Sequence, residues 1–134
     1  MKRIQLIVLV LFMFISVTAN AGKSYPKAGD IETLKLLNNE EISKIFKGGN
    51  SIIGMNLKFN KECIQNYYND GTYDGTVASG KKKVAGKWKV ENNMICHLSK
   101  KKNKKICRAI YKDGDFFVEL NKDKMTNILK FKVK

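Results

Sequence analysis

The most regular pattern in the chain is an alternation of apolar and polar residues that begins near residue 50. Short apolar segments are separated by turn sequences such as Asn-Asp-Gly and Lys-Asp-Gly, which typically connect antiparallel strands. We expect a mainly β fold with a minor α component, built as a single antiparallel meander that is curved or barrel-like. Its predicted strands are 51–59, 63–69, 72–78, 86–91, 94–99, 105–112, 116–120 and 126–133.

The same alternation predicts which side chains face the core. Trp88 and Val90 fall on one face of their strand, opposite two lysines and a glutamate. His97 and Ser99 are expected to point outward, toward water. The residues expected to point inward on the later strands are Met94, Cys96, Leu98, Cys107, Ala109, Tyr111, Phe116, Val118, Leu120, Leu129, Phe131 and Val133.

One helix is predicted before the strands. Asn38 followed by Glu41 has the spacing of a capping box. Gly48 and Gly49 are suited to end the helix, which we expect to lie across one end of the sheet. Its apolar stripe has spacings of three and four residues and consists of Ile42, Ile45 and Phe46.

The first residues resemble an export signal. Lys2 and Arg3 precede an apolar run, and Ala19 and Ala21 have the spacing that a signal peptidase recognises. We therefore predict a signal peptide at 1–21, an irregular lead-in at 22–37 and one β-rich domain at 38–134. The mature protein is expected to be periplasmic or secreted, with no transmembrane span.

The strongly basic composition favours acidic partners. The formal net charge is +14, and loss of Lys2 and Arg3 would leave +12. An anionic glycan, lipid headgroups or an acidic protein would be attracted, whereas a basic enzyme as the target of an inhibitor would be repelled. Ordinary solvated strand faces are the more common reason for such abundant surface lysine, so the charge alone does not identify a partner.

Two lysine runs are the candidate anion-binding residues. If their strands are neighbours, they could form one basic surface that binds phosphates without reading a nucleic-acid sequence. No stacking aromatics are interleaved, so specific nucleic-acid binding is not expected. The candidates are Lys81, Lys82, Lys83, Lys87, Lys89, Lys100, Lys101, Lys102, Lys104 and Lys105.

The cysteines fit an oxidising compartment. Strands 94–99 and 105–112 would place Cys96 opposite Cys107, which suits a disulfide. Cys63 is then left over, either buried and inert or available for a covalent dimer of an otherwise monomeric protein.

No metal site, cofactor site or catalytic group is predicted. Cys96 and His97 are adjacent on a strand and therefore point to opposite faces, and His97 is the chain's only histidine. No nucleophile motif is present, and the aspartates fall in predicted turns. We expect a protein that is not an enzyme.

An ordered set of turn and core residues resembles a family of short secreted proteins from Gram-negative bacteria, classified as a domain of unknown function. The resemblance implies a periplasmic location, a small β-rich fold and a bond between Cys96 and Cys107, but no activity. Cys63 and the lysine runs lie outside the pattern. The matching residues are Gly49, Asn50, Gly54, Asp70, Gly71, Gly86, Trp88, Cys96, Cys107, Tyr111, Asp113 and Gly114.

Three functions remain open on sequence grounds. The first is an exported, non-enzymatic binding or envelope-associated protein that contacts an anionic partner through lysines. The second is a lipocalin-like carrier of an apolar ligand inside the sheet, and the third is a secreted inhibitor or effector. The residues expected to line a carrier cavity are Trp88, Tyr111, Phe116 and Phe131.

Overall fold

The computed structural model describes residues 29–121 and 129–134. Within them the chain forms a short 3₁₀ helix, η1 (Ile31–Thr33), one α-helix and nine strands. The predicted signal peptide lies outside the described residues. The helix and strands are β1 (Lys35–Leu36), α1 (Asn39–Ile45), β2 (Ser51–Asn56), β3 (Lys61–Tyr67), β4 (Thr72–Val77), β5 (Lys82–Glu91), β6 (Met94–Ser99), β7 (Lys105–Asp113), β8 (Phe116–Leu120) and β9 (Leu129–Val133).

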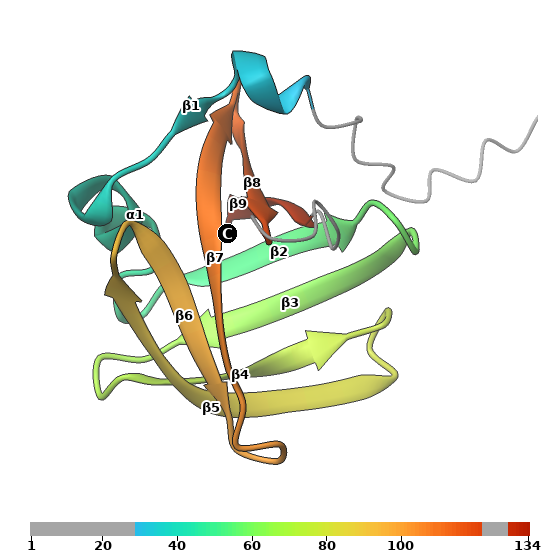
Figure 1. The fold of residues 1–134 in the computed structure, drawn as a ribbon. Coiled ribbons are helices and arrows are strands. Elements are labelled where there is room, and N and C mark those ends of the chain that lie inside the picture. Colours follow the sequence, from blue (N-terminus) through green and yellow to red (C-terminus); the bar gives the residue numbers. More distant parts are fainter. Residues whose placement is uncertain (1–28, 122–128) are drawn as a thin grey trace, which may run out of the picture.

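Strands β2 to β9 form a closed antiparallel barrel (Figure 1). Each strand from β2 to β8 pairs with the next along the chain, β8 pairs with β9, and β9 returns to pair with β2. The mainly β, barrel-like meander predicted from the sequence is confirmed. The short strand β1, inside the predicted lead-in, pairs with the C-terminal end of β7, at Tyr111 and Lys112.

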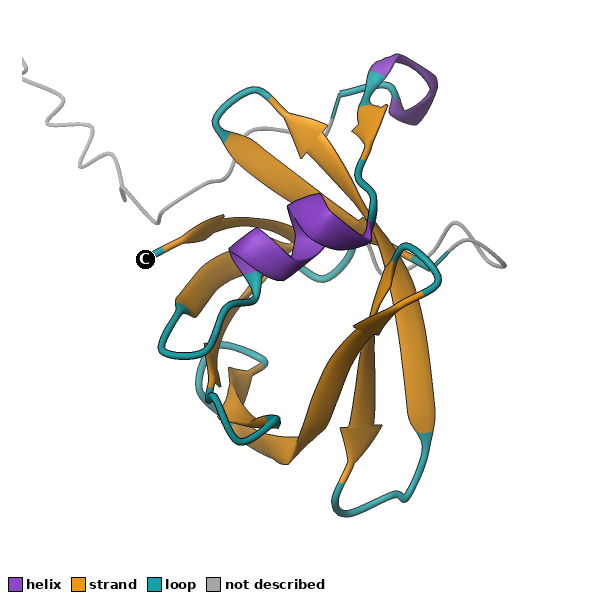
Figure 2. Cartoon of the chain, turned by 90° about the vertical axis from the view of Figure 1, so that its left-hand side faces the viewer, coloured by secondary structure: helices purple, strands orange, loops and turns teal. Residues whose placement is uncertain are grey.

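Helix α1 lies across one end of the barrel (Figure 2). The predicted capping box is present: the Asn38 side chain accepts from the Glu41 backbone, and the Glu41 carboxylate accepts from the Asn38 backbone. Asn39 and Asn93 exchange side-chain-to-backbone hydrogen bonds of 2.9 and 2.6 Å, which fasten the helix to the β5–β6 turn. The helix therefore closes the end of the barrel where that turn lies.

The register identifies the interior face, because residues directly opposite each other in paired strands point to the same side. Trp88 packs against the core and lies opposite His97. Val90, also in the core, lies opposite Ile95, which in turn lies opposite Arg108. His97 and Arg108 therefore point into the barrel.

The prediction of which side chains on β6, β7 and β8 point into the barrel is wrong. The same prediction for Trp88, Leu129 and Phe131 is right. The interior positions on these three strands carry polar side chains among the apolar ones, so the outer face looked more apolar than the inner. Residues predicted inward but found on the outer face are Met94, Cys96, Leu98, Cys107, Ala109, Tyr111, Phe116, Val118 and Leu120; those found inside instead are Ile95, His97, Ser99, Ile106, Arg108, Ile110, Phe117 and Glu119.

The predicted disulfide is present between Cys96 and Cys107. It lies on the outer face of the barrel, because Cys96 is opposite the exposed Lys89. Cys63 is a free cysteine inside the barrel and only 5% exposed. Burial raises the pKa of its thiol to about 12, so it is held as an uncharged, apolar group.

Candidate ligand-binding site at the open end of the barrel

A cavity of about 970 Å³ opens at the end of the barrel opposite helix α1. It lies next to the β4–β5 and β6–β7 loops, whereas α1 is fastened to the β5–β6 turn. Polar side chains from β3, β4, β6 and β7 point into it, and we call these the inner wall: Gln65, Tyr73, His97, Ser99 and Arg108. Basic side chains surround its mouth, and we call these the lysine rim: Lys82, Lys83, Lys100, Lys101 and Lys102.

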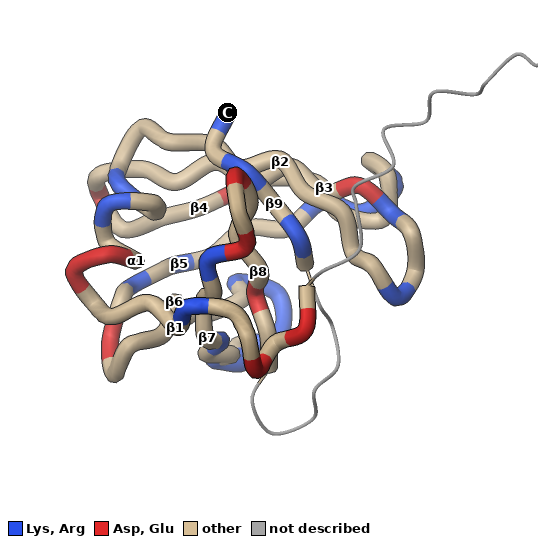
Figure 3. Tube along the Cα trace, turned by 90° about the horizontal axis from the view of Figure 1, so that it is seen from above, with Lys and Arg blue, Asp and Glu red and all other residues tan. Residues whose placement is uncertain are grey.

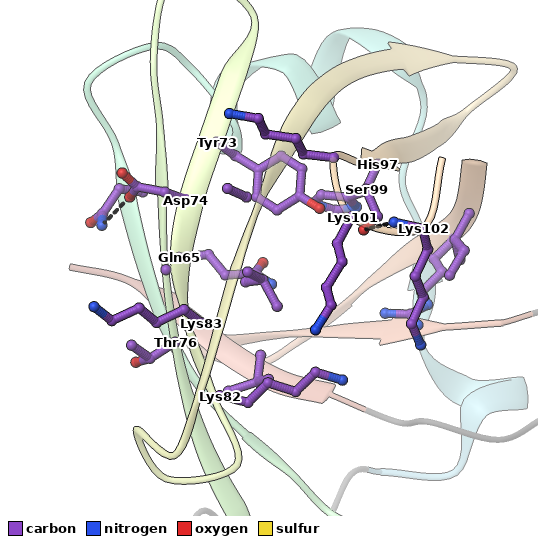
Figure 4. Close-up of a pocket in the computed structure, with 18 residues that line it drawn as sticks. Gln65, Tyr73, Asp74, Thr76, Lys82, Lys83, His97, Ser99, Lys101 and Lys102 are labelled. Carbon is purple, nitrogen blue, oxygen red and sulfur yellow. Dashed lines mark hydrogen bonds between the residues drawn. The ribbon is translucent and has the colours of Figure 1, made fainter. Parts of the chain in front are cut away.

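The lysine rim is positioned by backbone hydrogen bonds of the β6–β7 loop. The Lys100 backbone N–H donates to Ala85 on β5, and Asn103 donates to Ser99, with lengths of 2.9 Å each. Figure 4 shows Lys82, Lys101 and Lys102 extending toward the same part of the opening, whereas Lys83 points away from it. Three ammonium groups therefore converge at the mouth, Lys82 from β5 and Lys101 and Lys102 from the β6–β7 loop.

A hydrogen-bonded chain crosses the inner wall. The Tyr67 hydroxyl lies 2.7 Å from Gln65 Oε1, to which it donates, and 2.8 Å from His97 Nε2. Because a hydroxyl has one proton, His97 must donate from Nε2. That leaves His97 Nδ1 able to accept and the Gln65 amide nitrogen able to donate.

His97 is held as a neutral imidazole. Burial lowers its pKa below the usual 6.5, and although the Glu119 carboxylate opposes this shift, Arg108 adds to it. The ring packs edge-on to Tyr73, with centroids 4.8 Å apart. The predicted surface location of this histidine is wrong, because its side chain forms part of the cavity wall.

Arg108 and Glu119 form an ion pair within the barrel. Arg108 Nη1 donates to Glu119 Oε1 over 3.2 Å, and Glu119 is only 1% exposed. Arg108 Nε and Glu119 Oε2 are both buried and have no hydrogen-bond partner among the described residues. A buried pair is a weak source of stability, and unused donors and acceptors beside a cavity suggest a binding role.

Gly86 makes room for the ring of Tyr73 in the cavity wall. Gly86 lies opposite Tyr73, and a Cβ atom placed on it would come within 3.0 Å of the Tyr73 ring and 2.0 Å of the Leu98 carbonyl oxygen. The Tyr73 ring therefore occupies the space that a side chain at position 86 would take. Its hydroxyl makes no hydrogen bond to any described residue.

Only some of the ten lysines predicted to bind anions line the cavity. Five form the lysine rim. Of the others, Lys87 and Lys89 are exposed on the outer face of β5, and Lys89 and Lys105 both pair with Glu91. Figure 3 shows basic residues on several sides of the molecule rather than on one face. Lys81 and Lys104 lie in the loops beside the rim.

The cavity differs from the one expected for an apolar carrier. None of Trp88, Tyr111, Phe116 and Phe131 is among its lining residues. Trp88 and Phe131 belong to the packed core, and the other two face outward. The apolar lining comes instead from smaller side chains, Val77, Val84, Ala85 and Ile106.

One group of potential metal ligands is excluded by its chemistry. Glu91, Cys96 and Cys107 approach within 4.8 Å of one another, but the two sulfur atoms are bonded to each other. A disulfide offers no thiolate, which is the form of cysteine that binds metals.

No family model, curated protein or solved structure matches this chain. The family resemblance described from the sequence therefore stays a prediction. No helix within residues 29–121 and 129–134 has the length and apolar character needed to cross a membrane.

Proposed function

We propose that the protein is an exported, non-enzymatic binding protein that holds a small anionic ligand in the open end of its barrel. The observation that carries this proposal is the convergence of Lys82, Lys101 and Lys102 on a cavity of about 970 Å³. Ligand pockets typically have volumes of about 300–1,000 Å³ and a few placed polar groups on an apolar lining. The cavity has both properties.

The charge distribution supports an anionic rather than a cationic or apolar ligand. The carboxylate among the lining residues, Asp74, accepts hydrogen bonds from Asn66 and Tyr68, and Figure 4 shows it apart from the converging lysines. An entirely apolar ligand would leave the polar groups of the inner wall without partners, which is unfavourable. A wholly apolar carrier function is therefore the weaker alternative.

Export is part of the proposal and rests on the sequence and the disulfide. The predicted signal peptide directs the chain out of the cytoplasm, and disulfides persist in the periplasm or outside the cell. A monomer suffices for binding, because the cavity is built within one chain. A Cys63-linked dimer would require the buried thiol to leave the barrel interior.

Hexyl phosphate is a suitable probe, because it combines one anionic group with a short apolar tail. Isothermal titration calorimetry of the mature protein should show saturable 1:1 binding that weakens as salt is added. The double variant Lys82→Gln/Lys101→Gln should weaken binding by about tenfold, which corresponds to about 1.4 kcal/mol. Both substitutions lie in the lysine rim.

The matched control is Lys87→Gln/Lys89→Gln, which removes the same charge from the outer face of β5. The affinity of this control variant for hexyl phosphate should stay within about twofold of the wild type, because Lys87 and Lys89 do not line the cavity. Equal weakening by both variants would show that only net charge matters. Absence of saturable binding would contradict the proposed function.

A further inference from the structure

The cavity has two chemically different zones. The mouth carries the cationic lysine rim, whereas the inner wall is neutral overall: His97 is uncharged, and the charge of Arg108 is balanced by Glu119. A ligand that spans both zones would place its anionic group at the mouth. The part that enters the barrel would meet neutral hydrogen-bonding groups.

The inner wall has unused hydrogen-bonding capacity of both kinds. Gln65 Nε2 and Arg108 Nε can donate, and His97 Nδ1 can accept, while the hydroxyls of Tyr73 and Ser99 can donate. Within the described part of the chain, Arg108 Nε is buried without a partner, and Ser99 Oγ accepts only a 3.3 Å bond from the Lys102 backbone. Glu119 Oε2, 1% exposed, adds a buried acceptor behind Arg108.

We propose that the ligand is an anionic polyol, meaning a phosphorylated or carboxylated sugar or a related molecule with several hydroxyl groups. A hydroxyl both donates and accepts, so several hydroxyls can use the mixed set of groups on the inner wall. The phosphate or carboxylate lies among Lys82, Lys101 and Lys102. This inference rests on the proposed function and adds the chemical class of its ligand.

The balance of hydrogen bonds supports a hydroxylated ligand over a simple alkyl anion. An alkyl chain in this cavity would leave the buried donors and acceptors unpaired, and sites built to bond a polar group discriminate strongly against analogues that lack it. Tyr73 lines the same part of the cavity and contributes its hydroxyl. The small apolar residues Val84 and Ile106 complete the lining.

The test compares two probes with the same charged group: glucose 6-phosphate and hexyl phosphate. Calorimetry on the wild-type mature protein should give an affinity for glucose 6-phosphate at least about tenfold higher, since a few hydrogen bonds to neutral groups suffice for that ratio. Equal affinities would overturn the polyol inference and leave the anion site in place. Binding of neither probe would contradict the proposed function itself.

Variants that remove single hydroxyls sharpen this comparison. Tyr73→Phe keeps the ring over Gly86, and Ser99→Ala keeps the strand; together they should reduce the preference for glucose 6-phosphate over hexyl phosphate to within about threefold. Tyr68→Phe is the matched control, because Tyr68 is not among the lining residues and its hydroxyl bonds Asp74 rather than any group of the inner wall. An unchanged preference in Tyr73→Phe/Ser99→Ala would overturn the assignment.

The same chemistry occurs in free metabolites and in lipid headgroups, and vesicles distinguish the two. The protein should be incubated with vesicles of phosphatidylinositol and phosphatidylcholine and then sedimented. Cosedimentation that excess glucose 6-phosphate abolishes would assign a headgroup as the source of the polyol phosphate. Binding of free glucose 6-phosphate without cosedimentation would assign a free molecule.

Discussion

The two ends of the barrel differ in composition and in packing. At the helix-covered end, Phe46 is fully buried and packs against Tyr67 and Phe131, with ring centroids 4.9 and 5.7 Å apart. At the open end, the interior positions carry His97 and Arg108 beside a cavity. One continuous set of strands thus encloses a tightly packed half and a hollow, polar half.

This difference indicates that the two halves of one small domain have different roles, one in stability and the other in binding. Burial of apolar surface is the main favourable term in folding, so the helix-covered half is expected to supply most of the stability. Buried polar groups contribute little net stability, so the open half is better understood as a binding site. Substitutions in the two halves should therefore have separable effects.

The largest stability effect is expected from Phe46→Ala. Removal of this fully buried ring should lower the free energy of unfolding by about 3–5 kcal/mol, measured by urea denaturation. Affinity for hexyl phosphate, measured at low temperature where the variant is folded, should stay close to that of the wild type. A loss below about 1 kcal/mol would contradict the assignment of stability to the helix-covered half.

The disulfide should have the next largest effect. Cys96 and Cys107 are 11 residues apart, and the loop they close predicts a loss of about 2–3 kcal/mol in the double variant Cys96→Ser/Cys107→Ser. The bond lies on the outer face, so the cavity lining is retained. Denaturant unfolding of this variant, with reduced wild type as a second comparison, checks the value; equal stability in all three proteins would contradict it.

A smaller effect is expected at the start of the helix. Asn38→Ala removes the side chain that caps α1, and it should destabilise the protein by about 1 kcal/mol. Lys44→Ala is the control, because it breaks an exposed pair with Glu40 that contributes about 0.5 kcal/mol or less. Thermal denaturation distinguishes the two; a larger loss from the control would mean that the cap is not what holds the helix.

The smallest effect is a pH dependence at the open end. Because burial lowers the pKa of His97 below 6.5, the unfolded chain binds its proton at a higher pH than the folded chain does. The free energy of unfolding should therefore fall as pH drops below about 6.5, until the folded-state pKa is reached.

His97→Gln should flatten this part of the stability curve, whatever its effect on stability at neutral pH. Denaturant unfolding at a series of pH values between about 7 and 5 measures the slope directly. A slope as steep as that of the wild type would show that other groups, not the imidazole, cause the dependence.

The sequence predicted the elements well, because turn residues and capping residues act locally. Each of the eight predicted strands overlaps a barrel strand, and the Asn38 capping box is present. The disulfide was predictable too, because the spacing of Cys96 and Cys107 across a hairpin fixes their pairing. Closure of the barrel depends on the pairing of β9 with β2, a long-range contact that leaves no local signal.

The candidate site was only half predictable. Lysine runs at 81–83 and 100–102 identified the rim, but not which lysines converge on it. The inner wall was missed, because polar residues such as His97 and Arg108 were assigned to the solvent side of their strands. The alternation itself was misleading: on β8, Glu119 stands between Val118 and Leu120, which predicts an outward side chain, yet it lies opposite the core residue Ile110 and points inward. Functional groups are where such patterns are expected to fail.

The most direct test of the division between the two ends is an NMR titration of ¹⁵N-labelled mature protein with hexyl phosphate. Saturable shifts should occur in backbone amides at the cavity, around His97, Ser99 and the loop 100–104, while amides of α1 and of Lys87 and Lys89 stay unchanged. Shifts centred on the outer face of β5, or none that saturate, would contradict a binding site inside the open end of the barrel.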